Sequence, residues 1–423
     1  MKLTLEQAIG QKLMLSFVGT EPPSDFLAML RRQHFGGVTL FRGMNTTDPA
    51  QVRRLTDLLQ SAAAESGQPP LLVAVDQEGG QLMAIDGGTT YFPGNLALGA
   101  TGSVDLAYKT GYAMGRELAA MGVNVNYAPS CDVNSNPRNP VIGTRSFGED
   151  PAMVAQLSVA MVRGLQAAGV AATAKHFPGH GDTASDTHHG LVVVPHDRER
   201  MQQIEIPPFA AAIAAGVRLV MTAHIAVPAF EADMLLPATL SPRLLRGLLR
   251  DELGFDGVII SDAMEMAAIT QGREFVVDAL AAAAAGIDLL LLNSDTMMQQ
   301  DAYAGLLQAA RRALLAPGDV LASAERVLAL KHWLAEQPRP ALDVVGSAEH
   351  RALADEIAAG SITLVRDDAR LLPLRPSPNA RLAVIVPRPV DLTPADTSSY
   401  VTCALAEALR RYHPAVHEFV VAH

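Results

Sequence analysis

Short apolar runs recur along most of this 423-residue chain, and most of them are followed by a stretch with helical periodicity. Eight such runs cover residues 13–18, 36–41, 71–75, 123–128, 170–174, 219–223, 257–260 and 286–292. Their number and their alternation with helices predict an α/β fold, a TIM-like (β/α)8 barrel of parallel strands. An open doubly wound sheet is the alternative, but the carboxyl ends of its strands would not all face one pocket.

The remaining residues predict a small second domain. Gln337-Pro-Arg-Pro-Ala341 reads as a linker. We therefore expect a barrel catalytic domain over 1–336, a linker over 337–346 and a small α/β C-terminal domain over 347–423. Its expected elements are helices over 347–359 and 395–411, and strands over 361–365, 381–386 and 416–421. Because so few strands do not make a stable sheet unless they are covered, this domain should lean on the barrel or pair with a second chain.

Composition indicates which partners the chain can bind and in which cellular compartment it is expected. The formal net charge of −11 provides no basic stripe to meet phosphates, so we expect no nucleic acid partner. Cys131 and Cys403 lie far apart, which indicates a reducing compartment without a disulfide framework. The first fifteen residues are interrupted by charged and polar side chains and do not read as a signal peptide. No apolar run reaches the ~18 residues of a membrane helix. These features predict a soluble, cytoplasmic protein.

The densest group of titratable side chains lies in Lys175–Pro195, KHFPGHGDTASDTHHGLVVVP. Within it, Asp186 stands two residues before His188, where it can accept the imidazole N–H and raise the proton affinity of the ring. The alternative is a metal site built from its four histidines, His176, His180, His188 and His189. Neither an H-E-x-x-H motif nor a cysteine pattern accompanies them, so we expect neither metal nor cofactor.

Further polar side chains follow other predicted strands. They are Asp76, Asp132, Lys175, His176, His224 and Asp262. In a barrel the carboxyl ends of the strands converge on one face, so these groups should meet there. A carboxylate after the seventh strand and an Asp–His pair after the fifth suggest a nucleophile and an acid/base. Simpler interpretations are a helix N-cap near residue 266 for Asp262, a turn residue for Asp76 and a surface ion pair for Arg145.

Five motifs together resemble glycoside hydrolase family 3, in its β-N-acetylglucosaminidase branch. They are KHFPGHG at 175–181, DTH at 186–188, DQEGG at 76–80, GTRSFGED at 143–150 and SDAMEM at 261–266. Their order and spacing agree with the family over residues 1 to about 335.

The resemblance implies a barrel whose glycosidic chemistry retains the anomeric configuration. It implies Asp262 as the nucleophile and His188 as the acid/base, with Asp186 as the partner of His188. It also implies four residues that hold the hydroxyls and the amide of the sugar: Asp76, Arg145, Lys175 and His176.

Two departures from the family pattern concern substrate and size. Gln81 and Ala84 stand where peptidoglycan-recycling members carry arginines, which puts identical sugar contacts in doubt. Two-domain members also carry a longer second domain, so the C-terminal domain here is expected to be incomplete.

We expect an exo-β-N-acetylglucosaminidase that hydrolyses terminal β-linked N-acetylhexosamine residues, with a place in cell-wall sugar recycling. The alternatives are a β-N-acetylglucosaminide phosphorylase and a sugar-binding protein without turnover. Water is favoured over phosphate as the acceptor because 175–195 holds no arginine and no second lysine, and because the chain is acidic.

Overall fold

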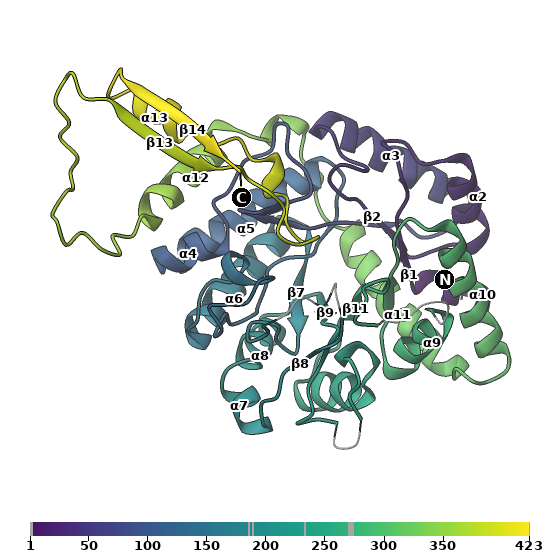
Figure 1. Ribbon diagram of the computed structural model, residues 1–423. Coiled ribbons are helices and arrows are strands. Elements are labelled where there is room, and N and C mark those ends of the chain that lie inside the picture. The colour runs from purple at the N-terminus through teal and green to yellow at the C-terminus, as the bar shows by residue number, and fades with distance from the viewer. Residues whose placement is uncertain (1–2, 185–186, 188–189, 232–233, 270–274, 423) are drawn as a thin grey trace. The chain divides into compact units, whose positions relative to one another are not determined.

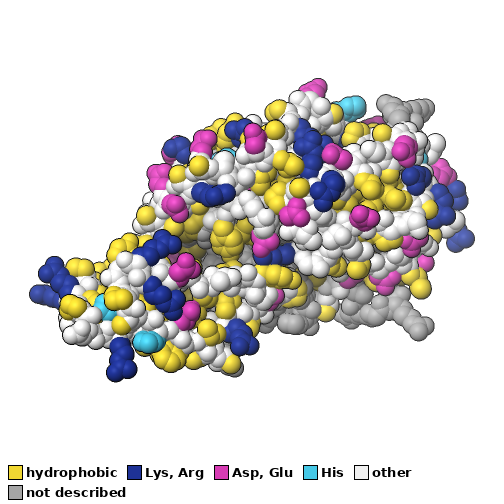
Figure 2. Space-filling view, turned by 90° about the horizontal axis from the view of Figure 1, so that it is seen from above, with side chains coloured by type: hydrophobic (Ala, Val, Ile, Leu, Met, Phe, Trp, Pro, Cys, Tyr) yellow, Lys and Arg dark blue, Asp and Glu magenta, His cyan; other side chains and the backbone are white. Residues whose placement is uncertain are grey.

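The computed structural model describes residues 3–184, 187, 190–231, 234–269 and 275–422. By the contacts among its residues the chain divides into two compact units, Met1–Ser361 and Ile362–His423. No helix in the described ranges combines the length and apolarity needed to cross a membrane. On the face drawn in Figure 2, Lys and Arg side chains lie interspersed with Asp and Glu rather than gathered by sign.

The described residues of the first unit form a closed barrel of eight parallel strands (Figure 1). In barrel order these are β1 (Leu13–Leu15), β12 (Leu289–Leu291), β11 (Val258–Ala263), β9 (Leu219–Thr222), β7 (Ala171–Phe177), β6 (Val125–Asn126), β3 (Leu72–Val75) and β2 (Gly37–Thr39). Met14 closes the ring, because it pairs with Leu291 on one side and Gly37 on the other. The predicted (β/α)8 barrel is confirmed, and the open doubly wound sheet is wrong.

Strand β7 runs further than its apolar residues predict. It continues through Lys175 and His176, which we expected in a loop. The reason is that Lys175 keeps pairing with the chain beyond β6: its N–H donates to the Pro129 carbonyl at 3.2 Å, and its carbonyl accepts from Cys131 at 2.6 Å. Both side chains are therefore held by a strand.

Helices surround the strands of this unit (Figure 1). They are α1 (Leu5–Gln11), α2 (Ser24–Gln33), α3 (Pro49–Glu65), α4 (Asn95–Thr101), α5 (Val104–Ala120), α6 (Pro151–Ala167), α7 (Arg198–Gln203), α8 (Pro207–Ala214), α9 (Phe275–Ala285), α10 (Thr296–Arg311), α11 (Pro317–Ala335) and α12 (Ala348–Ser361). A further helix, Arg243–Glu252, is wound as a π-helix. The predicted capping box at the start of α1 is present, with Thr4 and Gln7 each satisfying the backbone N–H of the other.

Apolar packing fills the inside of the barrel and the layer between strands and helices. The inner cluster includes Met14, Leu72, Val125, Tyr127, Leu219, Ile260 and Leu289. Helix α11 adds Val327 and Leu330 to it. The same helix donates from Lys331 to Gln11 and accepts from Lys12 on Ser323, just before β1. Helix α11 thus covers the end at which the strands begin and leaves the opposite, carboxyl end for chemistry.

The second unit holds less regular structure than we expected. Strands β13 (Leu382–Pro387) and β14 (Val416–Val421) pair in parallel, and α13 (Leu405–Arg410) packs on β14. The predicted strand over 361–365 is wrong, because Ser361 ends α12 and residues 362–365 form no regular secondary structure. Ile362 and Val365 are exposed. The predicted helix over 395–411 is α-helical only within α13.

Helix α12, which we expected in the C-terminal domain, packs on α4 and α5 and belongs to the first unit. A buried carboxylate on α5 anchors it. Glu117 accepts hydrogen bonds from the Thr90 backbone and hydroxyl (2.9 and 2.6 Å), from the Gly346 N–H (3.0 Å) and from His350 Nδ1 (2.8 Å). The expected linker also lies inside this unit, and the catalytic-domain limit at 336 stays a prediction.

We expect Glu117→Gln to weaken the attachment of α12. An amide cannot accept all four hydrogen bonds, so buried donors lose their partner, at a cost of at least about 2 kcal/mol in the free energy of unfolding. Denaturant unfolding and protease cleavage within 341–361 measure this effect. The matched control is Glu356→Gln on the exposed face of α12. Equal stability and equal cleavage of the two variants would contradict the role of Glu117.

Candidate active site

A buried ion cluster lies at the carboxyl ends of β3 and β7. Lys175 Nζ contacts Asp76 Oδ1 at 2.6 Å and Glu78 Oε1 at 2.5 Å. Arg145 grips the same Glu78 with both sides of its guanidinium fork, Nη2 to Oε1 at 2.8 Å and Nε to Oε2 at 3.0 Å. The side chains of Lys175 and Glu78 are 1% and 2% exposed, whereas that of Asp76 is 25% exposed. Asp76 is therefore the member of the cluster most open to a ligand.

Mutual compensation keeps these groups charged. Burial opposes ionisation of Glu78, but Arg145 and Lys175 hold its pKa at about 2. Burial likewise opposes the charge of both cations, yet the surrounding carboxylates raise the pKa of Lys175 and of Arg145 above their ordinary values. Both cations are thus fixed point charges at any physiological pH.

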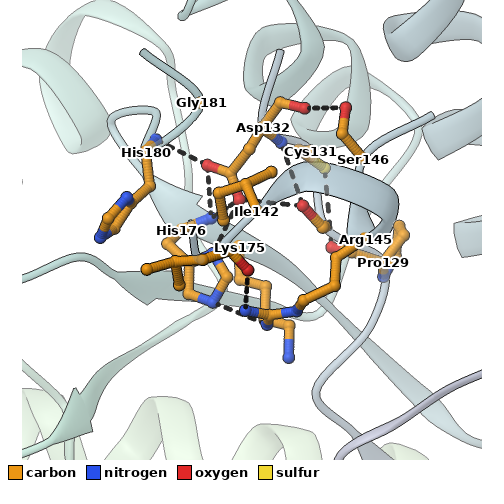
Figure 3. Close-up of polar contacts among 12 residues, drawn as sticks. Pro129, Cys131, Asp132, Ile142, Arg145, Ser146, Lys175, His176, His180 and Gly181 are labelled. Carbon is orange, nitrogen blue, oxygen red and sulfur yellow. Dashed lines mark hydrogen bonds and ion pairs between the residues drawn. The ribbon is translucent and has the colours of Figure 1, made fainter. Parts of the chain in front are cut away.

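A second buried carboxylate, Asp132, orients His176. It accepts from the backbone N–H of His176 (3.2 Å to each oxygen), the backbone N–H of His180 (2.7 Å), and His176 Nδ1 (2.7 Å). Burial opposes its ionisation, but the His176 ring and the His180 N–H hold the pKa of Asp132 well below its ordinary value. Figure 3 shows the Arg145 guanidinium reaching the other ring nitrogen, His176 Nε2, at 3.3 Å. Since arginine only donates, Nε2 accepts and Nδ1 carries the proton that faces Asp132.

Asp262 lies near the end of β11 and is partly exposed. Its Oδ1 accepts from the Ala263 N–H at 2.8 Å. The N-cap interpretation is wrong, because residues 264–269, where that helix was expected to start, form turns and a bend. Burial raises the pKa of the Tyr127 hydroxyl, and the carboxylates of Asp76 and Asp262 raise it further. Tyr127, which follows β6, therefore lies near the carboxylates that follow β3 and end β11. This agrees with convergence of the three strand ends on one face of the barrel.

Two more histidines buttress this face. His180 lies between the hydroxyls of Thr183 (Nδ1, 2.8 Å) and Thr187 (Nε2, 3.3 Å), and burial followed by the neighbouring His176 lowers its pKa to about 4. His224, which follows β9, contacts the Ala263 carbonyl through Nε2 at 2.9 Å. It thereby braces the residue next to Asp262. A metal at either ring would have to displace these bonds.

Asp186 and His188 lie outside the described residues, but Thr187 between them is described. Its carbonyl accepts a hydrogen bond from the Ala268 N–H at 3.2 Å. Ala268 is six residues after Asp262, in the turns that follow β11. The chain between the predicted acid/base and its partner thus touches the segment that follows the predicted nucleophile.

Four of the residues predicted from the sequence lie together in the structure. The structure joins Asp76, Lys175, Arg145 and His176 through direct contacts, and the simple surface ion pair proposed for Arg145 is wrong because the residue is buried. The sequence analysis did not single out Glu78, which contacts both Lys175 and Arg145. Its signal was available, because in extended chain a residue two positions after Asp76 points to the same side.

The two positions that depart from the family pattern also have structural roles. Gln81 accepts a hydrogen bond from the Thr144 hydroxyl, beside Arg145. The backbone N–H of Ala84 donates to the Asp76 carbonyl at 3.0 Å, so Ala84 supports the Asp76 turn through its main chain. Strands β4 (Gln77–Gly79) and β5 (Leu82–Met83) form the small hairpin that carries these residues.

Comparisons with known proteins agree with this architecture. The model of the glycosyl hydrolase family 3 N-terminal domain matches residues 4–330. A β-hexosaminidase A from Pseudoalteromonas piscicida is 38% identical in an alignment of 414 positions that covers 88% of this chain and 69% of the relative.

Solved structures extend the likeness to the fold. A family 3 β-N-acetylglucosaminidase from Paenibacillus sp. str. FPU-7 superposes with a TM-score of 0.93 at 41% identity, over 100% of this chain and 80% of its own. A β-glucoside phosphorylase, BglX, bound to 2FGlc has a TM-score of 0.86 at 26% identity, over 99% of this chain and 76% of its own. The chain therefore belongs to glycosyl hydrolase family 3 and is a glycoside hydrolase.

Proposed function

We propose that the protein is a retaining exo-β-N-acetylglucosaminidase that removes terminal β-linked N-acetylhexosamine residues. The observation that carries the proposal is the contact between the Thr187 carbonyl and the Ala268 N–H. It sets Thr187, which stands between Asp186 and His188 in the sequence, against the turns that follow Asp262. A retaining glycosidase needs its proton donor and its nucleophile close together around one glycosidic bond.

In the proposed mechanism, an Asp262 oxygen attacks the anomeric carbon through an oxocarbenium-like transition state. The bond to the leaving oxygen breaks as the ester bond forms, and protonated His188 gives its proton to that oxygen. Neutral His188 then takes a proton from water while the water oxygen attacks the same carbon. Asp262 leaves as a carboxylate, and the sugar is released with its configuration retained. Asp186 orients the imidazole throughout.

We assign sugar binding to the buried cluster. Asp76 is the most open member and accepts hydrogen bonds from sugar hydroxyls, while Lys175 and Arg145 supply fixed positive charge behind it. His176, held by Asp132, keeps Arg145 in place from the other side. Because these charges are arranged before the substrate binds, little reorganisation is needed when charge develops at the sugar.

The similarity to a β-hexosaminidase and to a β-N-acetylglucosaminidase supports N-acetylhexosamine as the substrate class. A place in cell-wall sugar recycling is part of the proposal. Gln81 and Ala84 make the contacts beyond the first sugar differ from those of members that carry arginines there.

Phosphorolysis is the second candidate, because a solved structure of similar fold is named a β-glucoside phosphorylase. Phosphate would share the first step and replace water in the second. It would need cationic contacts beside the anomeric centre, and Lys175 and Arg145 are both engaged by Glu78. We therefore favour water as the acceptor.

Asp262→Ala should lower kcat on the order of 10³-fold or more, because the covalent step loses its nucleophile. Added azide should restore turnover of an activated β-glycoside and give the α-glycosyl azide, since azide enters from the side that the carboxylate vacated. The product is identified by NMR. Asp105→Asn, an exposed carboxylate on α5, serves as the control with parental kinetics. A rescued product of β configuration, or none, would exclude Asp262 as the nucleophile.

His188→Ala should cost about 10²–10⁴-fold on substrates with poor leaving groups and far less on activated aryl glycosides, which need no proton. The adjacent His189→Ala is the matched control. Asp186→Asn should move the alkaline limb of the kcat/KM profile to lower pH, because a carboxylate favours the imidazolium and its loss lowers the pKa of that ring. Equal losses on both substrate classes would refute the acid role.

Adding phosphate to the reaction tests whether water or phosphate is the acceptor. We expect N-acetylglucosamine as the product with or without ~10–50 mM phosphate, with sulfate added to match ionic strength so that screening is equal. The assay detects sugar 1-phosphate and measures the rate. Sugar 1-phosphate as the main product, with a large gain in rate over the sulfate control, would replace the hydrolase by a phosphorylase.

A further inference from the structure

A second group of metal-ligating side chains lies outside the residues assigned to sugar chemistry. Asp182 follows β7, His196 precedes α7, and Glu205 lies between α7 and α8. Each offers one ligand atom, and these atoms all lie within 4.8 Å of one another. Three separate stretches of chain thus bring an imidazole and two carboxylates to one point.

Arg200 on α7 is the cation that the structure places beside these groups. Its Nη2 lies 3.3 Å from Glu205 Oε1, 3.7 Å from Asp182 Oδ2 and 3.3 Å from Ser135 Oγ. His196 Nε2 contacts Asp182 Oδ2 at 2.5 Å. One positive charge therefore faces two carboxylates.

The fit of Arg200 is incomplete. The Glu205 side chain is 1% exposed, and among the described residues its Oε2 atom has no hydrogen-bond partner. The Arg200 Nε atom is also buried without a partner. Two buried polar atoms without a hydrogen-bond partner among the described residues are costly in one cluster. The Glu205 Oε2 atom therefore has an acceptor position that a ligand can use.

We propose that Asp182, His196 and Glu205 form a binding site for a divalent cation of the Zn²⁺ class. One imidazole nitrogen and two carboxylate oxygens are ligands that Zn²⁺ accepts, with water in the fourth position. Two carboxylates also carry the charge that balances a divalent cation. Hard cations such as Ca²⁺ and Mg²⁺ prefer all-oxygen sites and suit this donor set less well.

Modest movement would complete the geometry. Tetrahedral Zn²⁺ with bonds of 2.0–2.2 Å holds its ligand atoms about 3.3 Å apart. The three atoms already lie within 4.8 Å, so His196 and Asp182 would separate slightly while Glu205 approaches. Arg200 has to withdraw, and its side chain is 37% exposed, so solvent is within reach. The bound ion would tie the chain that follows β7 to the start of α7 and the α7–α8 turn.

The test uses the full chain without an affinity tag, stripped of metal with a chelator. Zn²⁺ is titrated in competition with a chromogenic zinc indicator, in parallel with Mg²⁺ and Ca²⁺. We expect one tight Zn²⁺ per chain, a rise in Tm on binding, and no comparable response to Mg²⁺ or Ca²⁺. His196→Gln and Asp182→Asn should each weaken binding at least about tenfold. The matched control is His417→Gln, an exposed histidine of the second unit, which should change nothing.

Arg200→Ala distinguishes a metal site from an ion-pair network. If Arg200 competes with the cation, its removal should tighten Zn²⁺ binding by about tenfold. If the cluster exists to hold Arg200, the variant should lose stability and gain no affinity for Zn²⁺. The proposal is overturned if the chain binds no stoichiometric Zn²⁺, if binding survives both His196→Gln and Asp182→Asn, or if Arg200→Ala fails to strengthen it. Anomalous scattering at the zinc edge then locates the ion in crystals.

Discussion

The ion pairs of the buried Glu78 carboxylate are the interactions on which the carboxyl end of the barrel depends. An isolated ion of this kind would cost several kcal/mol to desolvate. Glu78 is tolerable only because Lys175 and Arg145 meet it at hydrogen-bond distance, and each cation needs Glu78 for the same reason. The three residues come from the hairpin after β3, from β7 and from the turn before α6. Their mutual compensation therefore fixes three chain segments relative to one another.

The barrel brings this cluster and the other polar groups of the site to the same face. Parallel closure brings Asp76, Asp132, Lys175 and Asp262 to one face, although they are far apart in sequence. Polar contacts around these residues orient their side chains. Asp132 fixes the tautomer of His176, and His224 contacts the carbonyl of Ala263, the residue next to Asp262. The chemistry proposed for this face needs such preorganisation, because binding energy raises a rate only where it acts on the transition state.

Local patterns predicted elements well where tertiary pairing agreed with them, and failed where it did not. The eight barrel strands were predictable from short apolar runs, since each is buried on both sides. Residues 362–365 have a similar apolar character, but they form no strand and their apolar side chains are exposed. Conversely, Lys175 and His176 belong to β7 although both are polar, because the backbone after β6 continues to bond Lys175 and the Asp132 side chain accepts from the His176 N–H. Local sequence propensity contains no information about which strand or side chain will pair with a segment in the folded chain.

Periodicity and motif spacing are local properties, so they were enough to predict the barrel, the family likeness and most of the residues proposed for its carboxyl end. They did not reveal that Glu78 joins Lys175 to Arg145, nor that Glu117 fastens α12 to the barrel unit. Those facts depend on which buried charge meets which partner across more than sixty residues of chain. Only closure of the barrel brings such groups within a few ångströms, where the cost of burying a charge decides the pairing.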